Sequence, residues 1–225
     1  MLGAQPKISW EDHRTAALDV RAMTAGPLMN LLLASLESEP EPVSGDLKEI
    51  HSILKNCDHM ATLENRAVPI LCHWLRLAGQ KNPDERTADR AQALAILKEA
   101  AAEMRRLYGS VAVSMRDVQV VKRGAKEYPV PGVGSGQAAN PFISLFMSTA
   151  GPFENGKWYV TGGSSWLMLL AFDSPVRVFS IMPVGENEDS ASPHYADLTE
   201  LFSKRELKPF PFTDPEVRKY LEKSY

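Results

Sequence analysis

The fold of this chain is decided by residues 157–202, which read KWYVTGGSSWLMLLAFDSPVRVFSIMPVGENEDSASPHYADLTELF. Two nearly unbroken apolar runs, 166–172 and 176–183, are separated by Asp-Ser-Pro at 173–175, a sequence typical of a turn. A strand with one wet face alternates polar and apolar side chains, and neither run does so. We therefore expect an antiparallel hairpin buried on both faces, inside a layered domain.

A helix start is expected after this hairpin. Ser192 has a side chain that can cap the first turn, Pro193 suits the first helical position, and Asp197 lies near the positive end of the helix dipole. Between them lies His194, which could contact a substrate. We favour a structural role, in which His194 packs and hydrogen-bonds at the helix start and fixes the last helix against the sheet.

Several motifs in this part of the chain resemble one known family. They are the GGSSW entry into the first apolar run, the hairpin, a glycine followed by polar residues at 185–187, SPHYAD at 192–197 and KPFPFTDPEV at 208–217. Together they resemble the C-terminal end of the β-chain in the penicillin acylase and acyl-homoserine lactone acylase family. The resemblance is most specific over residues 155–217 and extends more weakly to Met1. It implies structural signature roles for Gly163, Ser165, Trp166, Ser192, Pro193, His194, Tyr195 and Asp197.

The resemblance also implies a fold and an activity. The family's enzymes are N-terminal-nucleophile amidohydrolases with an αββα sandwich, in which the first residue of the mature chain attacks an amide and its free α-amine acts as the base. This chain begins with Met1 and Leu2, so we expect the nucleophile on a missing upstream part. That part and a small acyl-amide substrate are the expected partners. No catalytic residue, metal ligand or cofactor is implied, and the family is typically periplasmic or secreted.

The whole chain is expected to have an α+β organisation. We expect a helical part at 1–109 and a β-rich part with C-terminal helices at 110–225, both belonging to one acylase β-chain domain whose sandwich is incomplete. The reason is that the spacing of apolar residues changes from about 3.6 to about 2 near Gly109. Gly109 is also the residue type that most often follows a helix C-terminus.

Individual elements follow from the same spacing. Helices are expected from Ser9 through Met23 to a break at Gly26-Pro27, and then at 46–57, 64–78, from Thr87 to Leu107, and from Thr213 to about Glu222. Strands before the hairpin are expected at 111–113, 118–121, 142–149 and 158–160.

Composition excludes some classes of partner. The 225 residues carry a net charge of −3 with a pI near 6.0, so the basic footprint of a nucleic-acid-binding protein is missing. No apolar run approaches 18 residues, so we expect no membrane-spanning helix. The first ten residues lack the charged and apolar regions of a signal peptide.

Other chemistries are weaker alternatives. GGSSW lacks the last glycine of a nucleophile elbow, and the glycines at 132, 134 and 136 lack the helix start and Lys-Ser/Thr pair of a phosphate loop. The five histidines show no metal-binding spacing, and Cys72-His73 is better explained by core packing than by thiol catalysis. Cys57 and Cys72 are either bridged or, as we favour, two buried core thiols.

The sequence is compatible with two functions. The chain is either the C-terminal portion of an acylase or a non-catalytic relative, meaning a structural half or a degenerate binding protein. Departures from the family pattern at Met115-Arg116, Glu186-Asn187 and Leu198 leave room for the second function.

Overall fold

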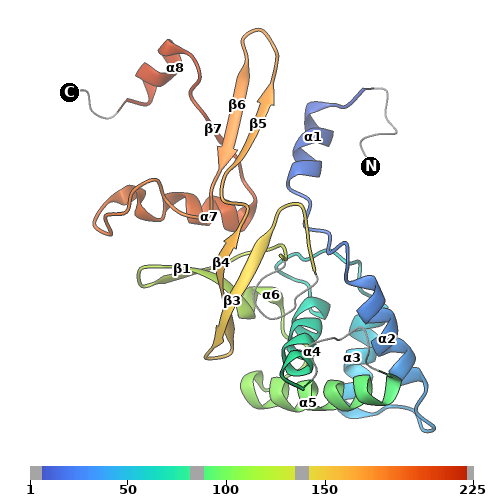
Figure 1. Ribbon diagram of the computed structural model, residues 1–225. Helices are drawn as coiled ribbons and strands as arrows, with labels where there is room; N and C mark the ends of the chain where they lie inside the picture. The colour runs from blue at the N-terminus through green and yellow to red at the C-terminus, as the bar shows by residue number, and fades with distance from the viewer. Residues whose placement is uncertain (1–6, 82–88, 135–141, 222–225) are drawn as a thin grey trace. The chain divides into compact units, whose positions relative to one another are not determined.

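The computed structural model describes residues 7–81, 89–134 and 142–221 (Figure 1). They fall into two compact units. Unit 1 comprises Met1–Leu18, Arg123–Tyr128 and Ser164–Tyr225, and unit 2 comprises Asp19–Lys122 and Pro129–Gly163. Thr87, Gly136 and Glu222, which entered the sequence predictions, lie outside the described residues.

Helices make up the first part of unit 2, as predicted. They are α2 (Gly26–Glu37), α3 (Gly45–Lys55), α4 (Ala67–Lys81) and α5 (Arg90–Tyr108). Figure 1 shows α5 crossing beneath α4, and α5 also packs against α2. The helices enclose a core of fully buried side chains that includes Leu32, Ile50, Leu54, Ile70, Leu71, Trp74, Leu97 and Met104. Burial of each such side chain contributes about 1.5–3 kcal/mol.

Local signals set the two ends of α5. Asp89 Oδ1 accepts a hydrogen bond from the backbone N–H of Gln92 at 2.8 Å, and Gln92 Oε1 accepts one from the backbone N–H of Asp89. This reciprocal pair satisfies two N–H groups that have no partner within the helix. At the other end, Gly109 has φ 72° and its N–H donates to the carbonyl of Arg105. The predicted glycine cap is therefore confirmed.

The first predicted helix is shorter than expected. Ser9 and Asp12 form the predicted capping box, but α1 (Trp10–Ala17) ends well before Met23. The residues that follow use their backbone groups elsewhere, since Ala22 N–H donates to the carbonyl of His59 and Ala61 N–H donates to the carbonyl of Val20. These bonds between distant segments replace the helical ones, so helical spacing alone was misleading here.

Unit 2 ends in a sheet. A short helix, α6 (Met115–Val118), leads into β1 (Gln119–Arg123), which runs parallel to β4 (Lys157–Gly163). β3 (Ser148–Glu154) pairs antiparallel with β4, and the two form the hairpin seen in yellow in Figure 1. Their turn contains Asn155 and Gly156 with φ 52° and 78°, and positive φ at both central residues is the pattern of a type I′ turn.

Two strand predictions in unit 2 were wrong. Val111 and Val113 are buried, but they lie in a connection and not in a strand. β3 begins at Ser148, whereas we expected a strand from Phe142. The backbone N–H of Ser144 donates to Val133 and that of Phe146 donates to Asp19, so this segment is held by loops and cannot join the ladder.

Unit 1 contains the central hairpin. β5 (Leu167–Ala171) pairs antiparallel with β6 (Arg177–Ile181) in the register Leu169 to Phe179, which confirms the predicted pairing. β7 (Lys208–Pro209) adds to the other side of β6. The remaining elements of unit 1 are α1, β2 (Lys126–Pro129), the 3₁₀ turn η3 (Pro193–Tyr195), α7 (Asp197–Lys204) and α8 (Asp214–Lys219).

Burial of the hairpin on both faces is wrong for the described residues. Leu169 is buried on β5, and Val178, Ser180 and Ile181 are buried on β6. At the two ends of the first apolar run, however, Trp166 is 57% exposed and Phe172 is 87% exposed. An apolar run thus predicted the strands correctly, but it did not say what covers them.

The order of helices and strands agrees with the predicted fold class. Helices precede residue 109, and the strands β1 to β6 follow it, so the α+β prediction is confirmed. The segment after Ser192 differs in detail, because a 3₁₀ turn occupies Pro193–Tyr195 and α7 starts only at Asp197. No helix in the described part of the chain combines the length and apolar character needed to cross a membrane.

Candidate functional site

The signature segment after the hairpin closes into a loop. The N–H of Gly185 donates to the carbonyl of Tyr195 at 3.2 Å, and the N–H of Asn187 donates to the carbonyl of His194 at 3.2 Å. A Cβ at Gly185 would overlap the carbonyl oxygen of His194 and the backbone of Tyr195. Only glycine therefore permits this close approach of the two backbones.

The SPHYAD turn is held by its own polar side chains. Ser192 Oγ accepts from the N–H of His194 at 3.1 Å, and Asp197 Oδ1 accepts from the N–H of Leu198 at 2.9 Å. The other oxygen of Asp197 lies 2.8 Å from Nδ1 of His194. His194 thus makes a hydrogen bond at the start of α7, in keeping with the structural role that we favoured, and the role itself stays a prediction.

Arg123 holds this loop, although no motif in the sequence pointed to it. Its Nε donates to the carbonyl of Tyr195 at 2.9 Å, and its Nη2 donates to the carbonyl of Asn187 at 3.2 Å. Its guanidinium also stacks 4.0 Å from the centre of the Tyr195 ring. Arg123 is 72 residues from Tyr195 in the sequence, and no local pattern links the two.

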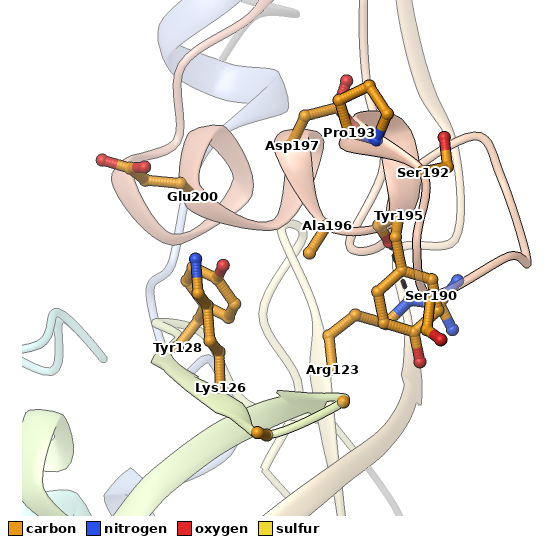
Figure 2. A pocket seen from close by; sticks show the side chains of 12 residues that line it. Arg123, Lys126, Tyr128, Ser190, Ser192, Pro193, Tyr195, Ala196, Asp197 and Glu200 are labelled. Atoms are coloured by element: carbon orange, nitrogen blue, oxygen red, sulfur yellow. Dashed lines mark hydrogen bonds between the residues drawn. The ribbon is translucent and has the colours of Figure 1, made fainter.

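A cavity of about 470 Å³ lies between the β1–β2 turn and the SPHYAD turn, within unit 1 (Figure 2). Figure 2 shows Lys126 and Tyr128 on one side of it and Arg123 reaching towards Tyr195 on the other. Its lining residues are Arg123, Gly124, Ala125, Lys126, Tyr128, Ser190, Ser192, Pro193, Tyr195, Ala196, Asp197 and Glu200. We call this cavity the signature pocket.

Charge in the signature pocket is mixed. Arg123 and Lys126 are cationic, whereas Asp197 and Glu200 are anionic. A hydrogen bond from Lys204 at 2.6 Å holds the pKa of the exposed Glu200 carboxyl below its usual value. The lining includes neither histidine nor cysteine, and Ser192 already accepts a hydrogen bond from the backbone. This chemistry suits holding a loop or recognising a polar group.

The predicted signature residues are only partly brought together. Ser192, Pro193, Tyr195 and Asp197 line the signature pocket, and His194 lies within the same turn. Ser165 and Trp166 are exposed and directly precede β5, where the Trp166 ring lies 6.4 Å from that of Phe210. Gly163 is the last residue of β4, in unit 2.

A second polar cluster lies inside unit 2. His73 on α4 has no exposed surface, and its Nδ1 lies 2.8 Å from Oε2 of Glu103 on α5. Its Nε2 lies 3.0 Å from the hydroxyl oxygen of Tyr108, and the same oxygen lies 2.8 Å from the carbonyl oxygen of Gly156. Arg76 pairs with the same oxygen of Glu103. The prediction that His73 is packed in the core is confirmed, but it missed the hydrogen bonds.

The buried cluster changes the acidity of its members. Burial lowers the pKa of His73, against the opposing effect of Glu103. Burial also acts to raise the pKa of Glu103, but hydrogen bonds from His73 and Arg76 outweigh it, so that this pKa is lowered overall. Burial raises the pKa of the Tyr108 hydroxyl well above its usual value.

The cysteines give no support to thiol chemistry. Cys57 and Cys72 form no disulfide and are both half-buried, so they are not bridged and are less enclosed than we expected. The Sγ of Cys57 accepts from the backbone N–H of His59 at 3.3 Å. Within residues 7–81, 89–134 and 142–221, three or more acidic, histidine or cysteine side chains do not gather in a way that could hold a metal ion.

Comparison with known proteins places the chain in a family. The penicillin amidase family model matches residues 1–219. The chain is 26% identical over 232 residues to an acyl-homoserine lactone acylase PvdQ of Pseudomonas fluorescens strain Pf0-1. It is 30% identical over 239 residues to the acyl-homoserine lactone acylase PvdQ of Pseudomonas syringae pv. syringae strain B728a. Both alignments cover 94% of this chain but only 29% of the relative. The extent of the family match shows that this chain belongs to the penicillin amidase family.

Proposed function

We propose that these 225 residues form the C-terminal portion of an acylase that hydrolyses an acyl amide of the penicillin or acyl-homoserine lactone type. They would supply sheet strands and supporting helices, while the nucleophile lies on a part of the enzyme outside them. The observation that carries the proposal is the family match over residues 1–219, together with a coverage of only 29% of the acylase relatives.

The open edge of β5 supports a structural partner. In the sheet order β5-β6-β7, β5 has a paired neighbour on one side only among the described strands. Its flanking residues Trp166 and Phe172 are exposed and apolar. An unpaired strand edge with apolar flanks is a template for another strand. The partner that we propose for it is a strand from the remainder of the acylase.

The signature pocket supports a scaffold role more than a catalytic one. Arg123 uses its guanidinium to hold the carbonyls of Tyr195 and Asn187, and Ser192 and Asp197 accept backbone N–H groups of their own turn. These contacts hold the loop, and they do not include a hydrogen bond between a nucleophile and a base. We therefore assign no catalytic residue to this part of the enzyme.

A complementation experiment tests the proposal. The 225-residue chain is purified alone, and also after co-expression with an upstream acylase part whose mature chain begins with Ser. Release of amine from an acyl-homoserine lactone and from a phenylacetyl amide is then measured for each preparation. We expect the chain alone to be inactive and to self-associate through β5, and the pair to be soluble and active.

Two outcomes would contradict the proposal. Turnover by the chain alone would show that its nucleophile lies within these residues. A stable complex with the upstream part that lacks amidase activity, although that part carries an intact N-terminal Ser, would favour the alternative of a non-catalytic relative. A complex in which that Ser is replaced by Ala provides the inactive control, because it keeps the interface and removes the nucleophile.

A further inference from the structure

The buried cluster of unit 2 contains a hydroxyl with two acceptors. His73 is enclosed by Arg76 of its own helix α4, by Glu103 and Tyr108 of α5, and by the rings of Phe153 and Trp158 from the β3–β4 hairpin. Among residues 7–81, 89–134 and 142–221, the charged and titratable groups that interact with His73 are Arg76, Glu103 and Tyr108. None of them belongs to the signature pocket, which leaves the cluster without an assigned role.

The Tyr108 hydroxyl cannot donate to Gly156 and to His73 at the same time. The oxygen of Tyr108 lies 2.8 Å from the carbonyl of Gly156 and 3.0 Å from Nε2 of His73. A tyrosine hydroxyl has one proton to donate. If that proton goes to Gly156, then Nε2 must carry its own proton and donate to the Tyr108 oxygen. If Nε2 carries none, it must accept the Tyr108 proton, and Gly156 loses its bond.

Glu103 determines which ring nitrogen of neutral His73 carries the proton. Its ionised carboxylate is an acceptor only, and it lies 2.8 Å from Nδ1, so the single proton of a neutral ring belongs on Nδ1. Nε2 then has a lone pair that faces the Tyr108 hydroxyl. The Tyr108 hydroxyl therefore donates its hydrogen bond to neutral His73 and not to Gly156. When both ring nitrogens of His73 carry a proton, the hydroxyl donates to Gly156 instead.

We propose that the Tyr108 hydroxyl is a two-position switch set by the protonation of His73. When His73 is neutral, the hydroxyl donates to Nε2 of His73. When His73 gains a second proton, Nε2–H donates to the Tyr108 oxygen and the hydroxyl donates to the carbonyl of Gly156. Acid thereby fastens the Asn155–Gly156 turn of the β3–β4 hairpin to α5.

The pKa shifts in the cluster favour the charge states that the switch requires. Burial lowers the pKa of His73 below the usual 6.5, so His73 gains its second proton only in acidic solution. The pKa of Glu103 is also lowered, and that of Tyr108 is raised. The shift of Glu103 favours the ionised carboxylate and the shift of Tyr108 favours the protonated phenol, which are the states that the switch requires.

The sequence offers a specific reporter for this switch. Residues 156–157 are the only Gly-Lys dipeptide in the chain. Protein made with carbonyl-¹³C glycine and ¹⁵N lysine therefore gives one signal in a carbonyl-to-amide correlation spectrum, and that signal reports the carbonyl of Gly156. A second sample with ¹⁵N histidine reports the ring nitrogens of His73. Both are followed from pH 8 to pH 4 on the full chain, alone or with its co-expressed partner.

We expect the Gly156 carbonyl signal to move in a single step whose midpoint equals that of His73 and lies below 6.5. Tyr108→Phe should abolish the carbonyl step while His73 still titrates. Tyr128→Phe, which removes a hydroxyl in unit 1, should leave the step unchanged. The proposal is overturned if the Gly156 carbonyl signal does not move while His73 titrates, or if the step survives in Tyr108→Phe. It is also overturned if neutral His73 carries its proton on Nε2. Should Tyr108→Phe not fold, the wild-type titration and the tautomer decide alone.

Discussion

Truncation of Leu169 tests which face of the hairpin is buried. Leu169 lies in the middle of β5 opposite Phe179 and is only 2% exposed. Truncation of a fully buried leucine to alanine costs about 2–5 kcal/mol, depending on how far the cavity collapses. The neighbouring residues of β5 are only half-buried and can relax. We therefore expect Leu169→Ala to lower the free energy of unfolding by about 2–3 kcal/mol.

The same hairpin provides a matched control. Phe172 is also apolar and lies just beyond β5, but it is 87% exposed. Phe172→Ala should change stability by no more than about 0.5 kcal/mol, because it removes few contacts. Leu169→Asp should prevent cooperative folding, since an unpaired buried carboxylate costs several kcal/mol.

Urea unfolding measures these differences. Circular dichroism and tryptophan fluorescence are recorded at low protein concentration, so that association does not add to stability. With a slope of about 2 kcal/mol per M, the midpoint of Leu169→Ala should fall by about 1–1.5 M. Equal losses for Leu169→Ala and Phe172→Ala would refute the assignment of the buried face. A folded, cooperatively melting Leu169→Asp would refute the burial of β5 altogether.

Four further predictions concern the loop, the cluster and a helix cap. Gly185→Ala should lower the free energy of unfolding by about 1–3 kcal/mol, because a Cβ overlaps the backbone of residues 194 and 195; urea midpoints measure it. Arg123→Lys should speed proteolysis at the 185–195 loop, since lysine cannot keep both carbonyl bonds and the ring stacking; unchanged cleavage would exclude the clamp. The free energy of unfolding should decrease as the pH is lowered below about 6.5, because the pKa of His73 is lowered in the folded state and the unfolded chain binds this proton more readily. The lowered pKa of Glu103 adds a further decrease below about 4.5. Urea midpoints of wild type and His73→Gln at each pH separate the contribution of His73 from that of Glu103. Asp89→Ala should cost about 1 kcal/mol by calorimetry through loss of the capping box.

Short-range patterns were enough for those ends of elements that a local cap or turn sets. Ser9 and Asp12 form a capping box in the structure, and Gly109 ends α5 in a left-handed conformation, both as predicted. The turn at 173–175 placed the strands β5 and β6 correctly. Each of these signals acts between residues within four positions of each other, so a linear sequence contains all that they need.

Long-range partners explain the failures. Helical spacing continued past Ala17, but the backbone of Val20 and Ala22 pairs with residues 59–61. Phe142 was expected to begin a strand, yet loops hold that segment until Ser148. A backbone group can satisfy its hydrogen bond locally or across the fold, and the pattern of side chains does not say which.

The sequence by itself determined the family, the α+β class, the pairing of β5 with β6, and those ends that a local signal sets, such as the start of α1 after Ser9 and the end of α5 at Gly109. Only the tertiary structure decided which side of the hairpin is covered, that Arg123 holds Tyr195, and that His73 meets Glu103 and Tyr108. The physical reason is distance along the chain. Those contacts join residues 30 to 72 positions apart, and such pairs meet only when whole elements pack together.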